Sequence, residues 1–187
     1  MSIKRIVCAA VAVLSLSVAA DAKVHSNALG LRFGGGSLSG AELNYQKGLR
    51  ANRLELGASW GFESHPQHLW YDNNGAPHYS GKYNTMHIGV IGFYQWHFNL
   101  ADVNGLNWYV GPGAGVGFWS WHREYAGTSY KEDDSGVDIN AGGQIGIEYD
   151  LNAVKVPLLL SLDLRAMLGL PGGGIWYHAG LGVRYTF

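Results

Sequence analysis

The feature that most constrains this chain is a period of two that recurs from residue 29 to residue 187. In residues 53–62, for example, apolar side chains alternate with arginine, glutamate, glycine and serine. An alternation of this kind places the two sets of side chains on opposite faces of a β-strand. The pattern occurs in eight segments, at residues 29–34, 41–46, 53–62, 86–98, 106–118, 137–149, 156–168 and 177–187.

Most of these segments are near the length that a tilted strand needs to cross a bilayer, which is about 9–11 residues. An even number of such strands is typical of bacterial single-chain barrels, whose strands are apolar on the lipid side and polar on the lumen side. The pattern therefore predicts an all-β fold, a closed eight-stranded antiparallel up-and-down transmembrane β-barrel.

The N-terminus predicts export. Lys4 and Arg5 precede an apolar or small run at residues 6–20, and Ala20-Asp21-Ala22 supplies a small-x-small cleavage pattern. We expect residues 1–22 to be a cleaved signal peptide and residues 23–187 to form the barrel, which reaches the cell outer membrane through the periplasm. The single cysteine, Cys8, lies in the segment expected to be removed, and we expect no cofactor and no thiol-based metal site.

The connections predict which end of the barrel faces outward. Residues 47–52, 99–105 and 150–153 are short, whereas residues 63–81 and 120–135 are long and polar. Outer-membrane barrels have short periplasmic turns and longer outside loops. With both termini in the periplasm, the two long segments are expected to be outside loops.

The polar face of the segments carries charges of both signs. An unpaired charge inside a narrow barrel is costly, so these side chains are expected to form a lumen charge network. Its predicted members are Arg32, Glu42, Arg53, Glu55, Asp138, Glu148, Asp163, Arg165 and Arg184.

One segment combines glycine with proline. The run Gly111-x-Gly113-x-Gly115-x-Gly117 has the period of a strand and lacks the spacing of a phosphate-binding loop. We expect these glycines to leave space for lumen side chains of a neighbouring strand, such as Ile91 and Phe93. Because Pro112 cannot donate to a β-ladder, a bulge or a missing hydrogen bond is expected there.

The last residues resemble the signal by which outer-membrane barrels are recognised by their assembly machinery. The chain has Phe187 at its end, Tyr185 two residues earlier and Val183 two before that. With the signal peptide and eight segments, the chain resembles small barrels of the OmpX and OmpA-transmembrane-domain type. The resemblance implies an integral outer-membrane protein whose partners are outer-membrane lipid, lipopolysaccharide and the barrel-assembly machinery.

Three functions are compatible with such a barrel. The favoured interpretation is a non-enzymatic protein whose outside loops 63–81 and 120–135 serve surface interaction with an unknown ligand or envelope integrity. The alternatives are a narrow channel and a lipid A-modifying enzyme of the PagL type, for which His25-Ser26-Asn27 lies at the wrong end. The formal net charge of −1 does not favour nucleic acid as a partner. The candidate recognition residues in the loops are Trp70, Tyr71, Tyr79, Trp121 and Tyr125.

Histidines and acidic residues in the predicted loops are candidate metal ligands. His65, His68 and His78 share a predicted loop with Asp72, but their spacing matches no defined site. The acidic run at 131–134 is expected to keep an exposed tip soluble. Neither group is therefore expected to hold a functional metal.

Overall fold

The structure is a computed structural model of the chain. It describes residues 26–36, 40–49, 52–66, 70–71, 77–78, 82–100, 103–124, 131–170 and 174–187. The predicted signal peptide, residues 1–22, lies outside the described residues and stays a prediction. No helix within these ranges is long and apolar enough to cross a membrane.

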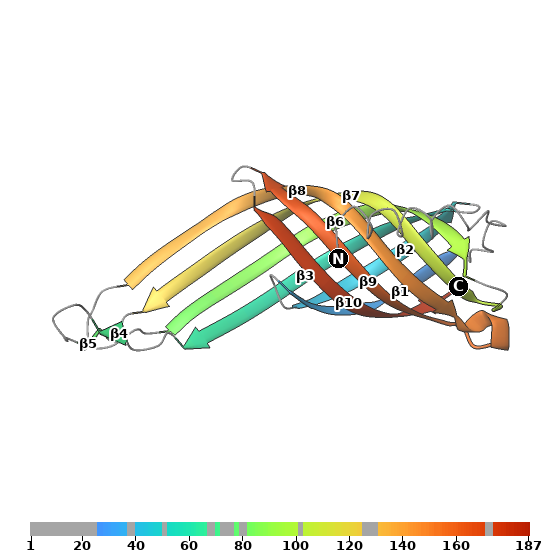
Figure 1. Cartoon of the computed structure of the whole chain (residues 1–187), viewed down its shortest axis with the longest axis horizontal. Helices are drawn as coiled ribbons and strands as arrows, with labels where there is room; N and C mark the ends of the chain where they lie inside the picture. Colours follow the sequence, from blue (N-terminus) through green and yellow to red (C-terminus); the bar gives the residue numbers. More distant parts are fainter. Residues whose placement is uncertain are drawn as a thin grey trace, which may run out of the picture.

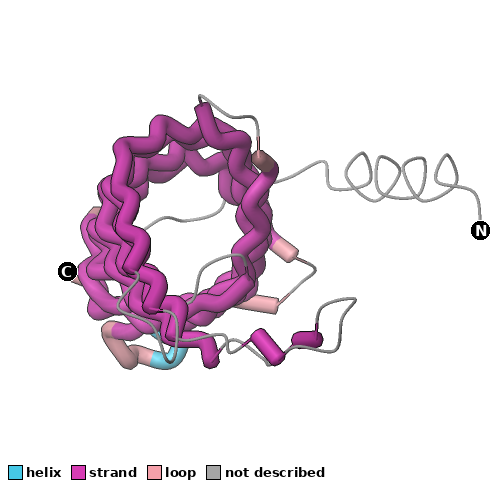
Figure 2. Tube along the Cα trace, turned by 90° about the vertical axis from the view of Figure 1, so that its left-hand side faces the viewer, coloured by secondary structure: helices cyan, strands magenta, loops and turns pink. Residues whose placement is uncertain are grey.

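Eight antiparallel strands close into a barrel, which confirms the predicted fold class (Figures 1 and 2). Each strand pairs with its neighbours along the chain, and β1 pairs with β10 to complete the ring. The strands are β1 (Asn27–Gly36), β2 (Gly40–Leu49), β3 (Asn52–Pro66), β6 (Lys82–Asn99), β7 (Leu106–Glu124), β8 (Lys131–Asp150), β9 (Leu158–Leu170) and β10 (Ile175–Thr186).

The first and last described residues lie together at one end, called here the terminal end. The backbone amide of Phe187 donates to the carbonyl oxygen of Asn27 at 2.9 Å, and the amide of Asn27 donates back to Phe187 at 3.1 Å. A short 3₁₀-helix, η1 (Leu151–Val154), connects β8 to β9 at this end. The opposite end, which carries the small hairpin of β4 (Trp70–Tyr71) and β5 (Pro77–His78), is called the far end.

Burial alternates along the strands, as the period of two requires. In β9 every second residue from Leu159 to Gly169 is buried, and the residues between them are exposed. The exposed set is apolar, as Leu160, Leu162 and Leu164 illustrate. The barrel therefore has its polar side chains inside and an apolar surface outside, the reverse of a water-soluble protein. Large apolar side chains on that outer surface include Leu29, Leu31, Phe33, Leu43, Leu56, Trp60, Ile88, Trp96, Ile139, Ile145, Ile147, Leu181, Val183 and Tyr185.

Four strands run further than the sequence pattern suggests. β3, β6, β7 and β8 have 15, 18, 19 and 20 residues, whereas β1 and β2 have 10 each. They extend the wall on one side of the far end into a projecting sheet, at the left of Figure 1. The prediction that 63–81 and 120–135 are loops is therefore wrong at residues 63–66, 120–124 and 131–135, which belong to barrel strands. β3 pairs with β6 out to Pro66 and Lys82, and β7 pairs with β8 out to Glu124 and Lys131.

The β6–β7 ladder is interrupted at Pro112, which confirms the predicted missing bond. Phe93 pairs with Gly113 and Trp96 pairs with Val110, while the intervening residues are unpaired across these two strands. The register is the same on both sides of the gap, so the proline removes ladder contacts without inserting a residue. The inward and outward faces of β7 are consequently preserved along its whole length.

Candidate functional site

The half of the lumen near the terminal end is filled by an ion-pair network. Arg165 on β9 donates to Glu42 on β2 at 2.6 and 3.1 Å and to Glu55 on β3 at 2.7 Å. Glu55 also accepts a hydrogen bond from Arg184 on β10 at 3.2 Å. Glu55 thus joins two guanidinium groups that come from different strands, and the contacts tie both sides of the barrel together.

Two further pairs extend this network. Arg53 forms a two-pronged pair with Glu148, with N–O distances of 2.6 and 2.8 Å. Arg32 pairs in the same way with Asp163, its Nη2 and Nε donating at 2.6 and 3.0 Å. All of these charged side chains are buried. Charges in a low-dielectric interior are tolerated only with close partners, and the pairing provides them. The buried side chains of this network are called here the plug: Arg32, Glu42, Arg53, Glu55, Glu148, Asp163, Arg165 and Arg184.

The structure brings eight of the nine predicted network residues together and places the ninth, Asp138, apart. Asp138 lies closer to the far end on β8, where its Oδ1 is 3.7 Å from His87 Nε2 and its Oδ2 accepts a hydrogen bond from Asn140 at 2.9 Å. Its position on the polar face of β8 was predicted, but its height in the barrel was not.

Uncharged polar side chains complete the network, and the sequence reasoning did not include them. Gln46 and Gln95 donate to Glu55 at 2.7 and 2.9 Å, and Asn44 accepts from Arg184 at 2.6 Å. These residues occupy alternate positions on the same faces as the charged ones, so extending the network along the polar face would have found them.

Two aromatic rings close the remaining space in the plug. Phe93 lies beneath the Arg165 guanidinium, 4.7 Å from ring centroid to Cζ, and Tyr109 stacks on His97 with centroids 5.1 Å apart. A Cβ at Gly113 would overlap the Phe93 ring, and one at Gly146 would contact Tyr109 at 2.5 Å. Glycine on these strands therefore makes room for the rings, as expected for the Gly111–Gly117 run.

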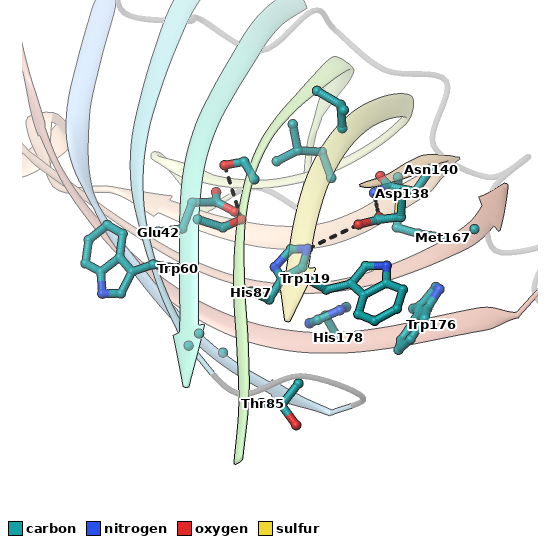
Figure 3. Close-up of a pocket in the computed structure, with 18 of the residues that line it drawn as sticks. Glu42, Trp60, Thr85, His87, Trp119, Asp138, Asn140, Met167, Trp176 and His178 are labelled. Carbon is teal, nitrogen blue, oxygen red and sulfur yellow. Dashed lines mark hydrogen bonds and ion pairs between the residues drawn. The ribbon is translucent and has the colours of Figure 1, made fainter. Parts of the chain in front are cut away.

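Above the plug the lumen opens into a cavity of about 810 Å³ at the far end. Its floor is formed by the charged heads of Arg32, Glu42 and Arg165, which also belong to the plug. Its walls come from both the projecting sheet and the short strands β9 and β10 (Figure 3). The aromatic and polar wall residues are Ser59, Trp60, Glu63, Tyr83, Thr85, His87, Trp119, Trp121, Asp138, Asn140, Trp176 and His178.

Glycines shape these walls by letting indoles lie flat. A Cβ at Gly136 would meet the Trp119 ring at 2.7 Å, and a Cβ at Gly169 would meet Trp176 Nε1 at 2.8 Å. At Gly117 a Cβ would touch both His87 and Asp138, at 2.5 and 2.6 Å. In Figure 3 the rings of Trp119, Trp176, His87 and His178 gather around one space, with Asp138 and Asn140 beside them.

The structure describes the side chain of only one of the five candidate loop residues, Trp121. Trp121 lies on β7 and lines the cavity beside Tyr83, with ring centroids 5.9 Å apart. Trp70 and Tyr71 form β4, but their side chains, and all of Tyr79 and Tyr125, lie outside what the structure describes. Trp119 and Tyr83 were missed because the predicted strands ended before these residues, which lie at inward positions of β7 and β6.

The remaining predicted residues lie away from the cavity. Val183, Tyr185 and Phe187 point outward at the terminal end and are exposed. Ser26 and Asn27 lie at that end too, far along the barrel from His178; His25 is outside the described residues. The predicted-loop histidines and Asp72 have no described side chains, and the described residues contain no cluster of three or more metal-ligating side chains.

The sequence matches no protein-family model and no curated protein. The fold is similar to solved outer-membrane barrels at low sequence identity. Neisserial surface protein A is 14% identical, with a TM-score of 0.47 over 86% of this chain and 94% of that one. The N-terminal β-barrel domain of Pseudomonas aeruginosa OprF is 19% identical, with a TM-score of 0.44 over 88% and 100%. The attachment invasion locus protein Ail of Yersinia pestis is 14% identical, with a TM-score of 0.41 over 87% and 97%.

Proposed function

We propose that this protein is a non-enzymatic, non-conducting integral outer-membrane barrel that uses its far end for interaction at the cell surface. The observation that carries the proposal is the combination of an apolar exterior with a plugged polar interior. A closed barrel pairs the backbone of its spanning strands internally, apart here from the gap at Pro112, which is what a lipid environment demands. An exterior of leucine, isoleucine and aromatic side chains suits lipid and would be costly in water.

The plug argues against a channel. Arg53, Glu55 and Tyr109 are 0% exposed, and Phe93 and Glu148 are 1% exposed. Side chains so fully enclosed do not line a water-filled passage. Eight strands give a barrel whose interior side chains can just fill it, and here the ion pairs and the two rings occupy that interior.

The asymmetry of the barrel supports a role for the far end. The terminal end has short connections, whereas the far end carries the projecting sheet of β3, β6, β7 and β8 together with the cavity. With the termini in the periplasm, that sheet would stand above the outer leaflet, where a ligand or another surface could reach it.

Insertion is tested by refolding the protein into lipid vesicles and comparing its mobility on SDS gels with and without boiling. We expect a boiling-dependent shift together with a β-type circular dichroism spectrum. A protein that is folded and soluble in detergent-free buffer would overturn the membrane assignment.

Closure is tested by current measurements in planar lipid bilayers. We expect the protein to give no conductance steps above those of the bare membrane. A variant with both rings of the plug truncated, Phe93→Ala with Tyr109→Ala, serves as the control for inserted protein and is expected to leak. Regular conductance steps from the unmodified protein would overturn the proposal in favour of a channel.

A further inference from the structure

The far-end cavity combines aromatic faces with two polar side chains, Asp138 and Asn140, and the nearest charged neighbour of Asp138 Oδ1 is His87 Nε2 at 3.7 Å. Asp138 Oδ1 and Asn140 Oδ1 are both buried, and neither accepts a hydrogen bond within the part of the chain that is described. Leaving a buried acceptor without a hydrogen bond costs about 1–3 kcal/mol. The two oxygens lie toward Gly117 and Gly115 of β7. Both side chains occupy neighbouring inward positions on β8 and line the cavity, so a rotation of each would present its oxygen to a ligand that donates two hydrogen bonds.

The aromatic groups stand close to those acceptors. Trp119 pairs across the strands with His87, the residue whose imidazole faces Asp138. Trp176 and His178 approach from β10 on the opposite wall of the same cavity. An indole offers an apolar face and an N–H donor at its edge, so a ligand between these walls meets flat apolar surfaces and polar groups together.

Charge in the cavity favours a neutral ligand. On the floor, Arg32 and Arg165 are neutralised by their pairs with Asp163, Glu42 and Glu55. Arg123 is not itself in the lining, but its guanidinium lies over the rings of two lining residues, Tyr83 and Trp121, 5.5 Å from each centroid. Glu63, also in the lining, is engaged in a contact of its own. A cationic ligand would approach the Arg32 and Arg165 guanidinium groups, and an anionic one would approach Glu42, Glu63 and Asp138.

Shape and polarity also disfavour a lipid chain. An acyl chain in this space would cover the Asp138 and Asn140 oxygens without hydrogen-bonding them. A sugar ring meets both requirements, because its C–H face packs on an indole while its hydroxyl groups donate to carboxylate and amide oxygens. The volume of about 810 Å³ lies within the range of small-molecule sites, about 300–1,000 Å³.

We infer that the far-end cavity is a binding site for a neutral hexopyranose, with Trp119 and Trp176 as stacking surfaces and Asp138 and Asn140 as hydroxyl acceptors. The inference rests on the proposed function in one respect, that the far end is open to the outside. It adds a defined site and a ligand class to the proposed role at the cell surface.

The test is calorimetric titration of the protein in phosphatidylglycerol nanodiscs, whose head groups carry neither a sugar ring nor an ammonium group. The probes are glucose, galactose, N-acetylglucosamine and lactose, with tetramethylammonium as the cationic comparison. We expect saturable binding of at least one sugar and none of tetramethylammonium. Trp119→Ala and Asp138→Ala should each weaken that binding about tenfold, because each removes an interaction of about 1.4 kcal/mol.

Two matched variants locate the binding. Trp96→Ala removes an exposed indole of β6 that is not among the residues lining the cavity, and Asp133→Ala removes a carboxylate that pairs with His122 on the other face of β8. Both should bind the sugar as the unmodified protein does. A sugar that binds equally to Trp119→Ala overturns the site, and tetramethylammonium binding without sugar binding overturns the ligand class.

The boiling-dependent gel shift is measured on the same samples. A shifted, non-conducting protein that binds none of the sugars overturns this inference and leaves the proposed function standing. A protein that shows no shift overturns the proposed function itself.

Discussion

At the scale of single residues, Glu55 accepts hydrogen bonds from more side chains than any other carboxylate of the plug. It accepts from Arg165, Arg184, Gln46 and Gln95 and is fully buried. We expect Glu55→Gln to lower the free energy of unfolding by about 3–5 kcal/mol, because removing one partner strands buried cations. The measurement is urea unfolding in vesicles, followed by tryptophan fluorescence.

The matched control for this change is Glu132→Gln. Glu132 is only partly buried, at 35% side-chain exposure, and its carboxylate is 3.7 Å from Arg123. An ion pair with that much solvent contact contributes about 1 kcal/mol or less. Equal unfolding midpoints for the two variants would mean that the plug does not stabilise the barrel.

Asp138 shows what residue-level reasoning can and cannot predict. The alternation on β8 predicts that Asp138 and Glu148 both lie on the inner face of the barrel, and both side chains lie there in the structure. The sequence does not say which residues of other strands lie at the same height. That depends on strand register, which pairs Glu148 with Asn107 but places Asp138 opposite Gly117.

At the scale of strands, neighbouring glycines on β8 are expected to differ sharply. A Cβ at Gly142 would overlap the backbone carbonyl oxygen of Ala166, whereas one at Gly143 would meet only Gly111 O at 3.5 Å. Backbone atoms cannot move aside cheaply, so we expect Gly142→Ala to cost about 1–3 kcal/mol of stability. Gly143→Ala should change it little. Urea midpoints of the two variants check this, and a reversed order would contradict the strand geometry.

The projecting sheet shows why strand ends were predicted poorly. Within lipid, the outer face of a strand must be apolar, so the period of two is visible in the sequence. Beyond the lipid both faces may be polar, as in His122 facing Asp133 and Arg123 facing Glu132 across β7 and β8. Strand pairing continues in these extensions, but the alternation of apolar and polar residues disappears. The sequence of such a segment therefore predicts a loop.

At the scale of the whole molecule, the closed ring and its strand order were predictable because they follow from eight amphipathic segments and short connections. The division of the lumen into a plug and a cavity was not. Glycines occur on the inner faces of both halves, under Phe93 in the plug and under Trp119 in the cavity wall. Whether such a glycine yields a filled or an open space depends on side chains from strands that only the closed barrel brings together.

The spanning barrel should fold without the tip of the projecting sheet. Pro66 and Lys82 are the last pair of the β3–β6 ladder, so residues 67–81 can be replaced by Asn-Gly, the two-residue turn that hairpins favour. The plug and the lipid-facing surface are untouched by this change. We expect an unchanged boiling-dependent gel shift and an unfolding free energy within about 0.5 kcal/mol of the original, as for distant independent sites.

A deeper truncation gives the contrasting case. Joining Gly61 to His87, another pair of that ladder, with the same turn removes Tyr83 and Thr85 from the cavity wall. The barrel should still shift on boiling, but its sugar binding should weaken relative to the shallow truncation. Loss of the folded band after the shallow truncation would instead show that the sheet is part of the folding unit, because the tip would then stabilise the strands that cross the membrane.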